Sequence, residues 1–307
     1  MSLKTALFDL KQNPENSVVV IYWPTACWKT DLSIEVAKLL WSEIISTDSQ
    51  QIFKGLDIWT WKISKEEKAW VKHHMIDIIE PSENYSVWEF KNNAEKIIDN
   101  LAFKGKVPVL VWWTGLYIDS LIFDFNIPKI PQDEDLRHNL ENFRLENWNQ
   151  KLWDKLNEID PKYALELHPN NYRYVIRWIE VKTISGKSKL DFRQNKKLKK
   201  NVVFITPYDN DREKLYARIN YRVEKMFEKG LVWEVEDLLK FYSRDDFWMK
   251  SIWYKEVVSF LNGEISKKEC IELIQKNSRN YAKRQITWFN KYKNYDAKIF
   301  EWVSRLW

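Results

Sequence analysis

Short apolar runs alternate with amphipathic segments along the first third of the chain. Five runs have the length and composition of buried strands, and they are VVVIY (18–22), EIIS (43–46), IDII (76–79), VPVLV (107–111) and the later VVFIT (202–206). Between them, Lys29–Leu40 and Val87–Leu101 repeat apolar residues at helical spacing. Strands that are separated by helices favour a parallel sheet with helices on both faces. The pattern therefore predicts an α/β fold.

The pattern changes between the fourth and fifth predicted strands. From about residue 133 to 200 the apolar positions follow helical spacing, and Pro131, Pro161 and Pro169 mark segment boundaries. The chain after residue 211 is again mostly helical in pattern. We therefore predict a helical insertion at 123–199 within an α/β core formed by 1–122 with 200–307.

The composition is that of a globular protein. The chain has 307 residues, of which 45% are hydrophobic, enough for one large domain or two modest ones. Cys27 and Cys270 form no disulfide framework, as expected for a reducing compartment. No apolar run approaches the ~18 residues of a membrane span, and the first residues lack the apolar centre of a secretory signal. The net charge of +5 permits an acidic partner without requiring one.

The chain is rich in tryptophan and poor in glycine. The chain has 18 Trp and 6 Gly, whereas glycine ordinarily makes up about 7% of a chain. Many tryptophans lie in polar, turn-like contexts such as WTWK (59–62), WWTG (112–115) and DFWMKSIWYK (246–255). Turns of this kind favour glycine, which alone adopts a positive φ at little cost. We infer that many of these tryptophans occupy glycine positions.

The stretch after the first predicted strand has the spacing of a phosphate-binding loop (P-loop). The pattern G-x-x-x-x-G-K-[ST] lies between a strand and a helix, and here it is occupied by Trp23, Pro24, Thr25, Ala26, Cys27, Trp28, Lys29 and Thr30. In such a loop, backbone amides and the helix N-terminus bind phosphate oxygens. Lys29 would add a cation, and the Thr30 hydroxyl would be a ligand of Mg²⁺. An ordinary strand-to-helix turn stays open, because tryptophan stands at both glycine positions.

Asp48 follows the second predicted strand, where an open α/β sheet has its ligand crevice. A carboxylate beside a phosphate site suits a base that acts on an attacking nucleophile. The adjacent Ser49, Gln50 and Gln51 offer polar groups for reading a base edge, although a lone aspartate here is also a common helix cap. The fourth strand leads to Thr114 and not to a metal-binding acid, which argues against a generic ATPase or GTPase.

Two basic stretches lie in the second half of the chain. Lys182–Lys200 has one acid, Asp191, among its many lysines, and Lys276–Lys293 has none. A solvated helix face would explain either stretch alone. Because the second stretch is interleaved with aromatic residues, the two together favour a polyanionic partner such as a nucleic acid.

Seven stretches together resemble the tRNA dimethylallyltransferases, also called tRNA isopentenyltransferases. They are PTACWKT (24–30), STDSQQIFKGLDI (46–58), HHMIDIIEP (73–81), VLVWWTGLYI (109–118), LHPNNYRYVIRWIEV (167–181), SIWYKE (251–256) and RNYAKRQITWF (279–289), in family order. The tryptophans at 23, 28, 59, 112, 113 and 253 stand where the family has glycine. The resemblance covers nearly the whole chain, and it implies a P-loop α/β core with a helical insertion that helps to hold tRNA.

The resemblance also implies a reaction and its residues. The dimethylallyl group of dimethylallyl diphosphate would pass to the exocyclic amine of the adenosine 3′ of the anticodon, with release of diphosphate. Asp48 would be the general base, Lys29 would stabilise the leaving group, and Thr114 would contact the nucleotide. The loop Trp23–Thr30 would bind the diphosphate with Mg²⁺, which Thr30 would coordinate. The implied contacts with the anticodon stem-loop are Asp48, Ser49, Gln50, Gln51, Thr114, Arg137, Arg173, Arg177, Lys250, Tyr254, Lys255 and Arg284. A cytoplasmic monomer without membrane attachment is expected.

Two other functions stay open at this point. A small-molecule P-loop kinase or an adenylate prenyltransferase would share the loop, but neither needs the helical insertion or the basic C-terminal third. An inactive RNA-binding relative is favoured by Trp23 and Trp28, since indoles there would stand where a diphosphate approaches the backbone. The retention of Lys29, Thr30, Asp48 and Thr114 argues against such a loss of activity.

Overall fold

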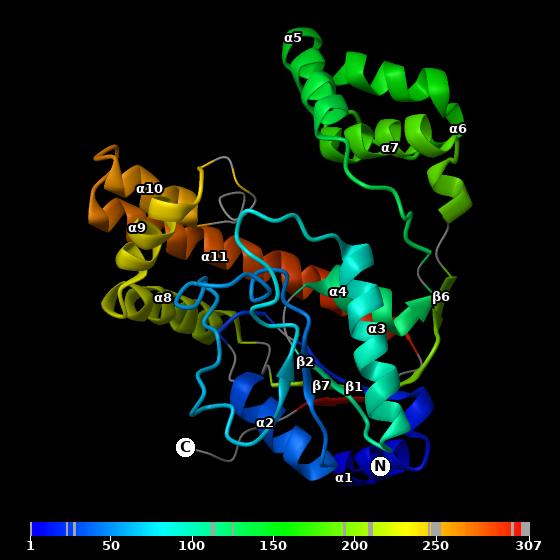
Figure 1. The fold of residues 1–307 in the computed structure, drawn as a ribbon, viewed down its shortest axis with the longest axis vertical. Helices are drawn as coiled ribbons and strands as arrows, with labels where there is room; N and C mark the ends of the chain where they lie inside the picture. Colours follow the sequence, from blue (N-terminus) through cyan, green and yellow to red (C-terminus); the bar gives the residue numbers. More distant parts are fainter. Residues whose placement is uncertain are drawn as a thin grey trace. The chain divides into compact units, whose positions relative to one another are not determined.

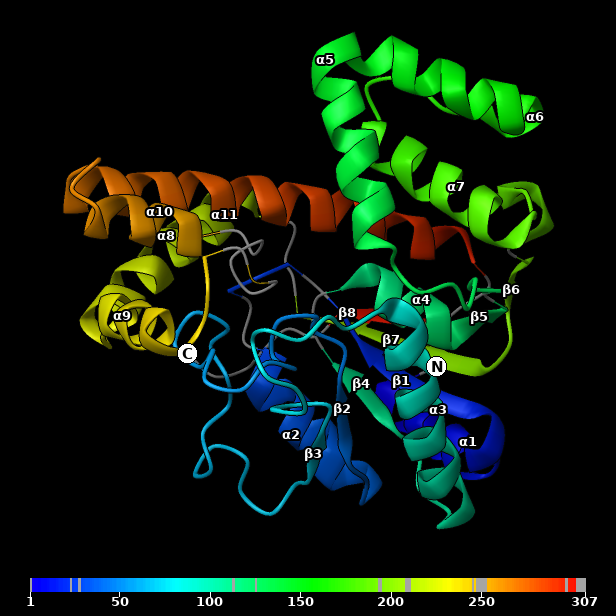
Figure 2. The ribbon, with the colours of Figure 1, turned by 45° about the horizontal axis from the view of Figure 1, so that its top comes forward.

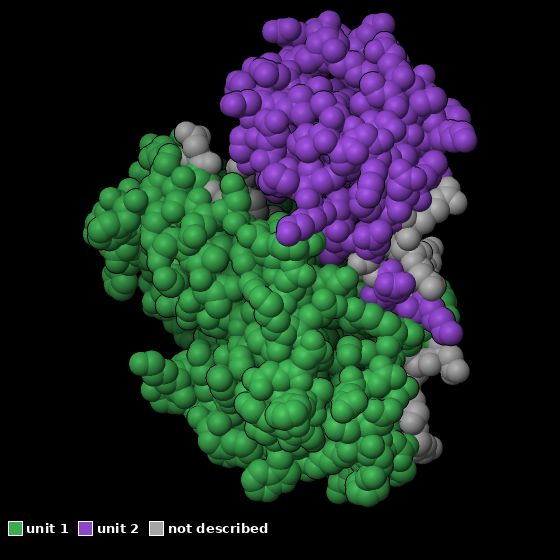
Figure 3. Space-filling view, turned by 45° about the vertical axis from the view of Figure 1, so that its right-hand side comes forward, with its two compact units in different colours: residues 1–122, 198–307 green, residues 123–197 purple. Residues whose placement is uncertain are grey.

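The computed structural model describes residues 2–22, 24–26, 29–111, 114–124, 126–192, 195–207, 211–244, 246, 253–295 and 298–301. The chain divides into two compact units, which Figure 3 shows in different colours. Unit 1 is Met1–Ile122 with Leu198–Trp307, and unit 2 is Phe123–Lys197. Unit 2 therefore begins at the residue predicted for the insertion and ends at Lys197 rather than at residue 199.

Unit 1 contains a six-stranded sheet, of which Figure 1 labels β1, β2 and β7. The strand order is β3-β2-β4-β1-β7-β8 (Figure 2). Neighbouring strands pair in parallel. The strands are β1 (Ser17–Ile21), β2 (Ile44–Ser46), β3 (His73–His74), β4 (Val109–Val111), β7 (Asn201–Thr206) and β8 (Lys298–Glu301). The predicted parallel sheet with flanking helices is thus confirmed. Strand β8 escaped prediction because its sequence, KIFE, holds only two apolar residues.

The strand predicted at 76–79 is wrong. The third strand is His73–His74, which pairs with β2. Met75 and Asp77 then have φ values of 63° and 56°, which interrupt an extended backbone. Beyond this turn, Ile78 and Ile79 donate their backbone N–H groups to the carbonyl of Ile52, at 2.8 and 3.1 Å. This apolar run therefore packs against the segment after β2 instead of extending the sheet.

Helices cover both faces of the sheet. Helices α1 (Leu3–Lys11) and α2 (Lys29–Leu40) pack on one face, against alternate strand residues that include Val19, Val109 and Val203. The opposite face presents residues such as Phe204, whose ring stacks on Tyr292 with centroids 4.7 Å apart. Helices α3 (Val87–Phe103) and α4 (Gly115–Ile122) are joined by the stacked rings of Phe90 and Tyr117.

The C-terminal helices of unit 1 form a second apolar core. They are α8 (Arg212–Glu228), α9 (Leu231–Phe241), α10 (Tyr254–Leu261) and α11 (Lys267–Asn290). Figure 2 shows α8, α9 and α10 gathered around the N-terminal half of the long helix α11. The same core includes Ile52, Phe53, Leu56 and Trp59, so the segment that follows β2 is built into it. Within the described residues, every helix is too short or too polar to cross a bilayer.

Unit 2 is mainly helical. Its helices are α5 (Glu134–Ile159), α6 (Pro161–Ala164) and α7 (Tyr172–Ser185), and β5 (Phe123–Asp124) pairs with β6 (Asn195–Leu198). Asp133 caps α5 and Asp160 caps α6 through side-chain bonds to backbone N–H groups. The helices enclose their own core, which contains Leu152, Leu156 and Val175.

Among the residues that the structure describes, four tryptophans have the positive φ that favours glycine. They are Trp41, Trp61, Trp148 and Trp253, with φ values of 54°, 52°, 69° and 92°. Trp148 is the most extreme, because its ψ of 164° places it in a region that is essentially restricted to glycine. The backbone at these positions thus agrees with the inference that several tryptophans occupy glycine positions. Trp59 is not among them, although its ring lies in the same core as Trp253.

Candidate active site

The carboxyl ends of β2 and β4 are tied together by hydrogen bonds. Thr47 donates its backbone N–H to the carbonyl of Val111 at 2.8 Å, and Thr114 donates its own to the carbonyl of Thr47 at 3.1 Å. The Thr114 hydroxyl also lies 3.0 Å from the Ser49 hydroxyl and accepts from the Ser49 N–H at 3.0 Å. Two of the predicted tRNA contacts, Ser49 and Thr114, are therefore neighbours.

Asp48 is oriented by its own turn. One carboxylate oxygen accepts the backbone N–H of Gln50 at 2.8 Å, and the Asp48 N–H points to the Ser46 hydroxyl at 3.4 Å. The residue is buried, with 8% of its surface exposed. A carboxylate held in one orientation at the edge of a parallel sheet is suited to accept a proton from a bound nucleophile.

A cavity of about 240 Å³ opens at this edge of the sheet. It is enclosed by the P-loop, the end of β2, the segment after β2, and helices α8 and α11. Its lining residues are Thr25, Asp48, Ser49, Gln50, Trp59, Thr60, Ile219, Arg222, Val223, Met226, Trp253, Ser278 and Tyr281. The wall is largely apolar, and its polar groups come from Thr25, from the β2 end, from Thr60 and from helices α8 and α11. The cavity can therefore hold a ligand with an apolar and a charged part.

Thr25 of the predicted P-loop is held by the C-terminal helices. Gln285 on α11 accepts the backbone N–H of Thr25 at 3.2 Å, and Arg222 on α8 donates to the Thr25 hydroxyl at 2.9 Å. Ala26 has a φ of 62°, a turn conformation that brings the chain toward α2. Arg222 thus places a guanidinium beside the predicted phosphate site.

Helix α2 begins at Lys29, as predicted, and Thr30 lies in its first turn. Pro24 and Thr25 are buried, and Ala26 and Thr30 are partly exposed. The placement of Trp23, Cys27 and Trp28 and of the Lys29 side chain lies outside what the structure describes. Their predicted part in diphosphate binding stays a prediction.

The negative charge of Asp48 acts on two tyrosines, the buried Tyr117 and the partly buried Tyr281. Burial raises the pKa of Tyr281, and the Asp48 carboxylate raises it further. Burial likewise raises the pKa of Tyr117, with a smaller contribution from Asp48. Both phenols therefore stay neutral at physiological pH, and Tyr281 presents a neutral aromatic side chain to the cavity.

Two tryptophans occupy part of the cavity wall. The rings of Trp59 and Trp253 have centroids 3.6 Å apart. The Trp253 indole donates to the Ser278 hydroxyl at 2.7 Å. Within the described residues no acceptor lies within hydrogen-bond distance of the buried Trp59 indole nitrogen, an arrangement that costs about 1–3 kcal/mol.

Two of the predicted tRNA contacts in unit 1, Gln51 and Tyr254, are buried. Gln51 is fully buried, accepts from the Ser46 hydroxyl at 3.0 Å and donates to the carbonyl of Thr60 at 3.3 Å. Tyr254 is 1% exposed, and its hydroxyl donates to Glu234 at 3.1 Å. Both side chains are therefore enclosed by protein and already have protein partners, and their predicted contact with tRNA stays a prediction.

The remaining predicted tRNA contacts of unit 1 differ in exposure. Lys255 and Arg284 are exposed, and Arg284 lies over the ring of Tyr281 with 5.6 Å to the centroid. Ser49 and Gln50 are partly exposed and line the cavity. Lys250 lies outside the described residues.

In unit 2, two predicted tRNA contacts bind a buried carboxylate instead. Arg137 binds Glu180 with two nitrogens, at 2.9 and 2.8 Å, and Arg177 forms a further ion pair with the same carboxylate. The Glu180 side chain is fully buried, whereas the arginines are partly exposed. Arg173 is exposed and lies near the Tyr172 ring, with 5.9 Å to the centroid. Arg137 and Arg177 therefore have a structural partner, and Arg173 is available to solvent.

Several residues of the site were missed in the sequence. Arg222, Ser278 and Gln285 lie on helices whose apolar spacing predicts a core and says nothing of a ligand. A helical projection of α11 offers one signal, since Ser278, Tyr281 and Gln285 fall on one face at intervals of three and four residues. Arg222 has no such signal, because its role depends on contact with Thr25 across the fold.

The chain matches a known protein family. The family model described as IPP transferase matches residues 51–292, and the chain belongs to this family. It is 45% identical to the tRNA dimethylallyltransferase of Acetivibrio thermocellus over 91% of this chain and 90% of that protein. It is 41% identical to that of Halalkalibacterium halodurans, over 94% of this chain and 95% of that protein.

Solved structures of similar proteins support the same family assignment. The full-length tRNA isopentenylpyrophosphate transferase of Bacillus halodurans matches with a TM-score of 0.66 and 42% identity, covering 94% of this chain and 90% of that one. A eukaryotic dimethylallyltransferase acting on tRNA matches with a TM-score of 0.80 and 26% identity, covering 94% and 74%. The resemblance seen in the sequence is therefore confirmed.

Proposed function

We propose that this chain transfers the dimethylallyl group of dimethylallyl diphosphate to the exocyclic amine of the adenosine 3′ of the anticodon in tRNA. Family membership supports this class of reaction. The observation that carries the proposal is that Asp48 and the P-loop residue Thr25 line one cavity with a largely apolar wall. A base, a phosphate site and room for a short allyl chain then adjoin one another.

The reaction follows from the charges of these groups. The amine nitrogen attacks the allylic carbon, the carbon–oxygen bond breaks, and its electron pair leaves with the diphosphate. Asp48 accepts the proton that the nitrogen loses, and its fixed orientation keeps the accepting oxygen in place. The Thr114 hydroxyl, held beside Ser49, is placed to orient the nucleotide.

The leaving diphosphate is stabilised by the P-loop side of the cavity. Backbone amides at the start of α2 and the helix dipole favour an anion there. Arg222 adds a guanidinium, which binds phosphate oxygens with planar geometry. Lys29 would contribute the second cation as the negative charge develops on the bridging oxygen.

The proposal includes Mg²⁺ bound with the diphosphate. Among the described residues, no group of three His, Cys, Asp or Glu side chains could hold a metal ion. Thr30, in the first turn of α2, would offer its hydroxyl as the protein ligand, and the ion would take its other oxygens from the diphosphate and water. The ion, when bound, would neutralise charge on the leaving group.

Each unit by itself presents residues proposed to contact tRNA. Lys255 and Arg284 of unit 1 and Arg173 of unit 2 are exposed cations suited to phosphates of the stem. The acceptor adenosine must leave its stack to reach Asp48 in a cavity. We expect a monomeric enzyme in the cytoplasm, where its tRNA substrate is found.

The choice of acceptor tests the proposal against the small-molecule alternatives. We expect the protein with labelled dimethylallyl diphosphate to modify an anticodon stem-loop RNA, to leave AMP unmodified, and to release one diphosphate per transfer. Transfer to AMP in preference to the stem-loop would establish an adenylate prenyltransferase instead. Phosphoryl transfer from ATP to a small molecule would establish a kinase.

A further inference from the structure

One wall of the cavity is a compact turn that follows β2. It comprises Leu56–Lys62, and its Trp59 and Thr60 face the cavity. Within the turn, the Thr60 hydroxyl donates to the carbonyl of Leu56 at 2.5 Å, and the Lys62 N–H donates to that of Asp57 at 2.9 Å. Such a turn leaves its first N–H groups without partners inside itself.

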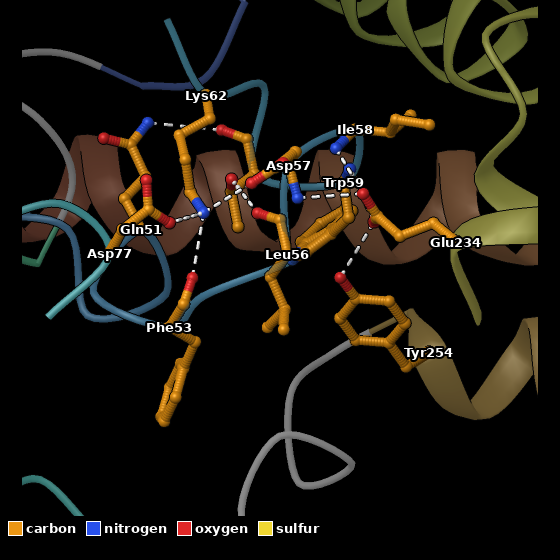
Figure 4. A network of polar contacts seen from close by, with 11 residues as sticks. Gln51, Phe53, Leu56, Asp57, Ile58, Trp59, Lys62, Asp77, Glu234 and Tyr254 are labelled. Atoms are coloured by element: carbon orange, nitrogen blue, oxygen red, sulfur yellow. Dashed lines mark hydrogen bonds and ion pairs between the residues drawn. The ribbon is translucent and has the colours of Figure 1, made fainter. Parts of the chain in front are cut away.

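Glu234 of helix α9 supplies those partners. One carboxylate oxygen accepts the N–H groups of Asp57 and Ile58 at 2.8 and 2.6 Å, and the other lies 3.3 Å from that of Trp59 (Figure 4). The Tyr254 hydroxyl donates to the second oxygen. Burial raises the pKa of Glu234, while the three amides and Tyr254 act to lower it. One carboxylate thus binds three successive amides, which is the geometry of an anion in a backbone nest.

The turn is also held from its other end. The Lys62 side chain is 6% exposed and donates to the carbonyl of Phe53 at 2.8 Å and to carboxylates of Asp57 and Asp77 at 2.6 and 2.5 Å (Figure 4). Lys62 therefore joins the turn to residues that are close to it in sequence, Phe53 and Asp77. Glu234 is different, because it ties the turn to a helix distant in sequence.

Hydrogen bonds lead from this turn to Asp48. The carbonyl of Thr60 accepts from the Gln51 amide, and the Gln51 oxygen accepts from the Ser46 hydroxyl. The same hydroxyl receives the N–H of Asp48. Because Gln51 and Ser46 are fully buried, water cannot replace a hydrogen bond that is lost from this series. The position of the turn therefore bears on the position of the predicted base.

We propose that Glu234 is a positioning residue of the transfer reaction. Its carboxylate holds Leu56–Lys62 as a preformed wall of the cavity and thereby keeps Asp48 in place; this inference rests on the proposed function. The diphosphate side of the cavity depends on Thr25 and Arg222, which lie outside this network. Loss of the carboxylate should therefore affect the chemical step more than the binding of dimethylallyl diphosphate.

The test compares Glu234→Gln with Glu236→Gln, an exposed glutamate of the same helix. Amide hydrogen exchange of the full chain reports the N–H groups of residues 57–59 directly. Steady-state transfer to the anticodon stem-loop gives kcat and KM. The fraction of protein that binds dimethylallyl diphosphate is measured for each variant, so that kcat refers to folded protein. Tyr254→Phe, which removes one donor and leaves the three amides bound, serves as a milder variant.

We expect Glu234→Gln to speed exchange at 57–59 and to lower kcat about 10- to 100-fold, with little change in KM for dimethylallyl diphosphate. Tyr254→Phe should give a smaller loss, and Glu236→Gln none. Unchanged exchange in Glu234→Gln, or faster exchange with a normal kcat, would overturn the inference. If the parent protein transfers nothing, the proposed function fails and this inference fails with it; faster exchange would then show a structural anchor only.

Discussion

Arg222 on α8 donates a hydrogen bond of 2.9 Å to the Thr25 hydroxyl and so joins the P-loop to a helix almost 200 residues further along the chain. The contact places a cation beside the predicted diphosphate, in a cavity that also contains Asp48. It also explains why the C-terminal helices matter to a site that begins near the N-terminus.

Replacing this guanidinium should impair use of the diphosphate. We expect Arg222→Gln to lower kcat/KM for dimethylallyl diphosphate about 100-fold, since a preorganised donor to a developing anion is removed. The measurement is steady-state transfer to the stem-loop at varied diphosphate substrate. Arg212→Gln, an exposed arginine of the same helix, is the matched control. Equal kinetics for both variants would show that Arg222 serves only the fold.

Replacing Trp148 by glycine should increase the stability of the protein. Its φ of 69° and ψ of 164° strain any side chain, and its indole is 81% exposed, so little packing is lost. We expect Trp148→Gly to stabilise the protein by about 1 kcal/mol. Trp233→Gly, an equally large change at an exposed position inside α9, should instead destabilise it by about 0.5 kcal/mol. Chemical denaturation measures both, and a loss of stability in Trp148→Gly would contradict the account.

The two tryptophans in the cavity should limit activity. Trp253 has a φ of 92°, and Trp59 buries an indole nitrogen that lacks an acceptor among the described residues. We expect the double variant Trp59→Gly, Trp253→Gly to enlarge the cavity and to raise kcat/KM about 10-fold, because substrate is held closer to its reactive position. Circular dichroism would verify the fold. A folded double variant with lower activity would show that the indoles form part of the binding surface.

Glu180 should stabilise unit 2 in a pH-dependent way. Burial acts to raise the pKa of Glu180, but the hydrogen bonds from Arg137, Arg177 and the Asp133 N–H outweigh it, so that the pKa lies below the ordinary value of 4.5. A lowered carboxyl pKa gives stability that is present above the ordinary pKa and is lost as pH falls through the lowered one. We expect Glu180→Gln to cost about 3 kcal/mol near neutral pH and less in acid.

Hydrogen exchange of α5 and α7 against pH measures this effect in the full chain. Glu158→Gln, at an exposed position of α5, is the control and should show no such dependence. If hydrogen exchange in both variants equals that of the parent at every pH, Arg137 and Arg177 are not held by Glu180 in solution. Their predicted role in tRNA binding would then be supported.

The sequence predicted the parts of the fold that local pattern determines. Strands β1 and β4 are continuous apolar runs buried on both faces, and α2 begins at Lys29 as its periodicity indicated. The third strand was misplaced because an apolar run was read as extended, whereas Met75 and Asp77 turn the backbone. Nothing local to that run reveals this, since the Ile52 carbonyl that binds its amides belongs to another segment.

The site was predictable where a motif fixes the spacing of its residues. Asp48 and Thr114 follow strands, and parallel strands bring their carboxyl ends together. The burial of Gln51 and Tyr254 was not predictable in this way, because the spacing of a motif does not show which way each side chain points. Arg222 and Glu234 act through contacts with distant segments, at Thr25 and at the Asp57–Trp59 amides, which one-dimensional spacing does not encode.

The most direct test of the central claim is the identity of the modified nucleoside. Anticodon stem-loop RNA would be incubated with dimethylallyl diphosphate and either the parent protein or Asp48→Asn, then digested and analysed by mass spectrometry. The account predicts a dimethylallyl group on the exocyclic amine of the adenosine 3′ of the anticodon with the parent, and a rate lower by about 10²–10⁴ with Asp48→Asn. RNA that is bound by the parent but left unmodified would contradict it and would identify an inactive RNA-binding relative.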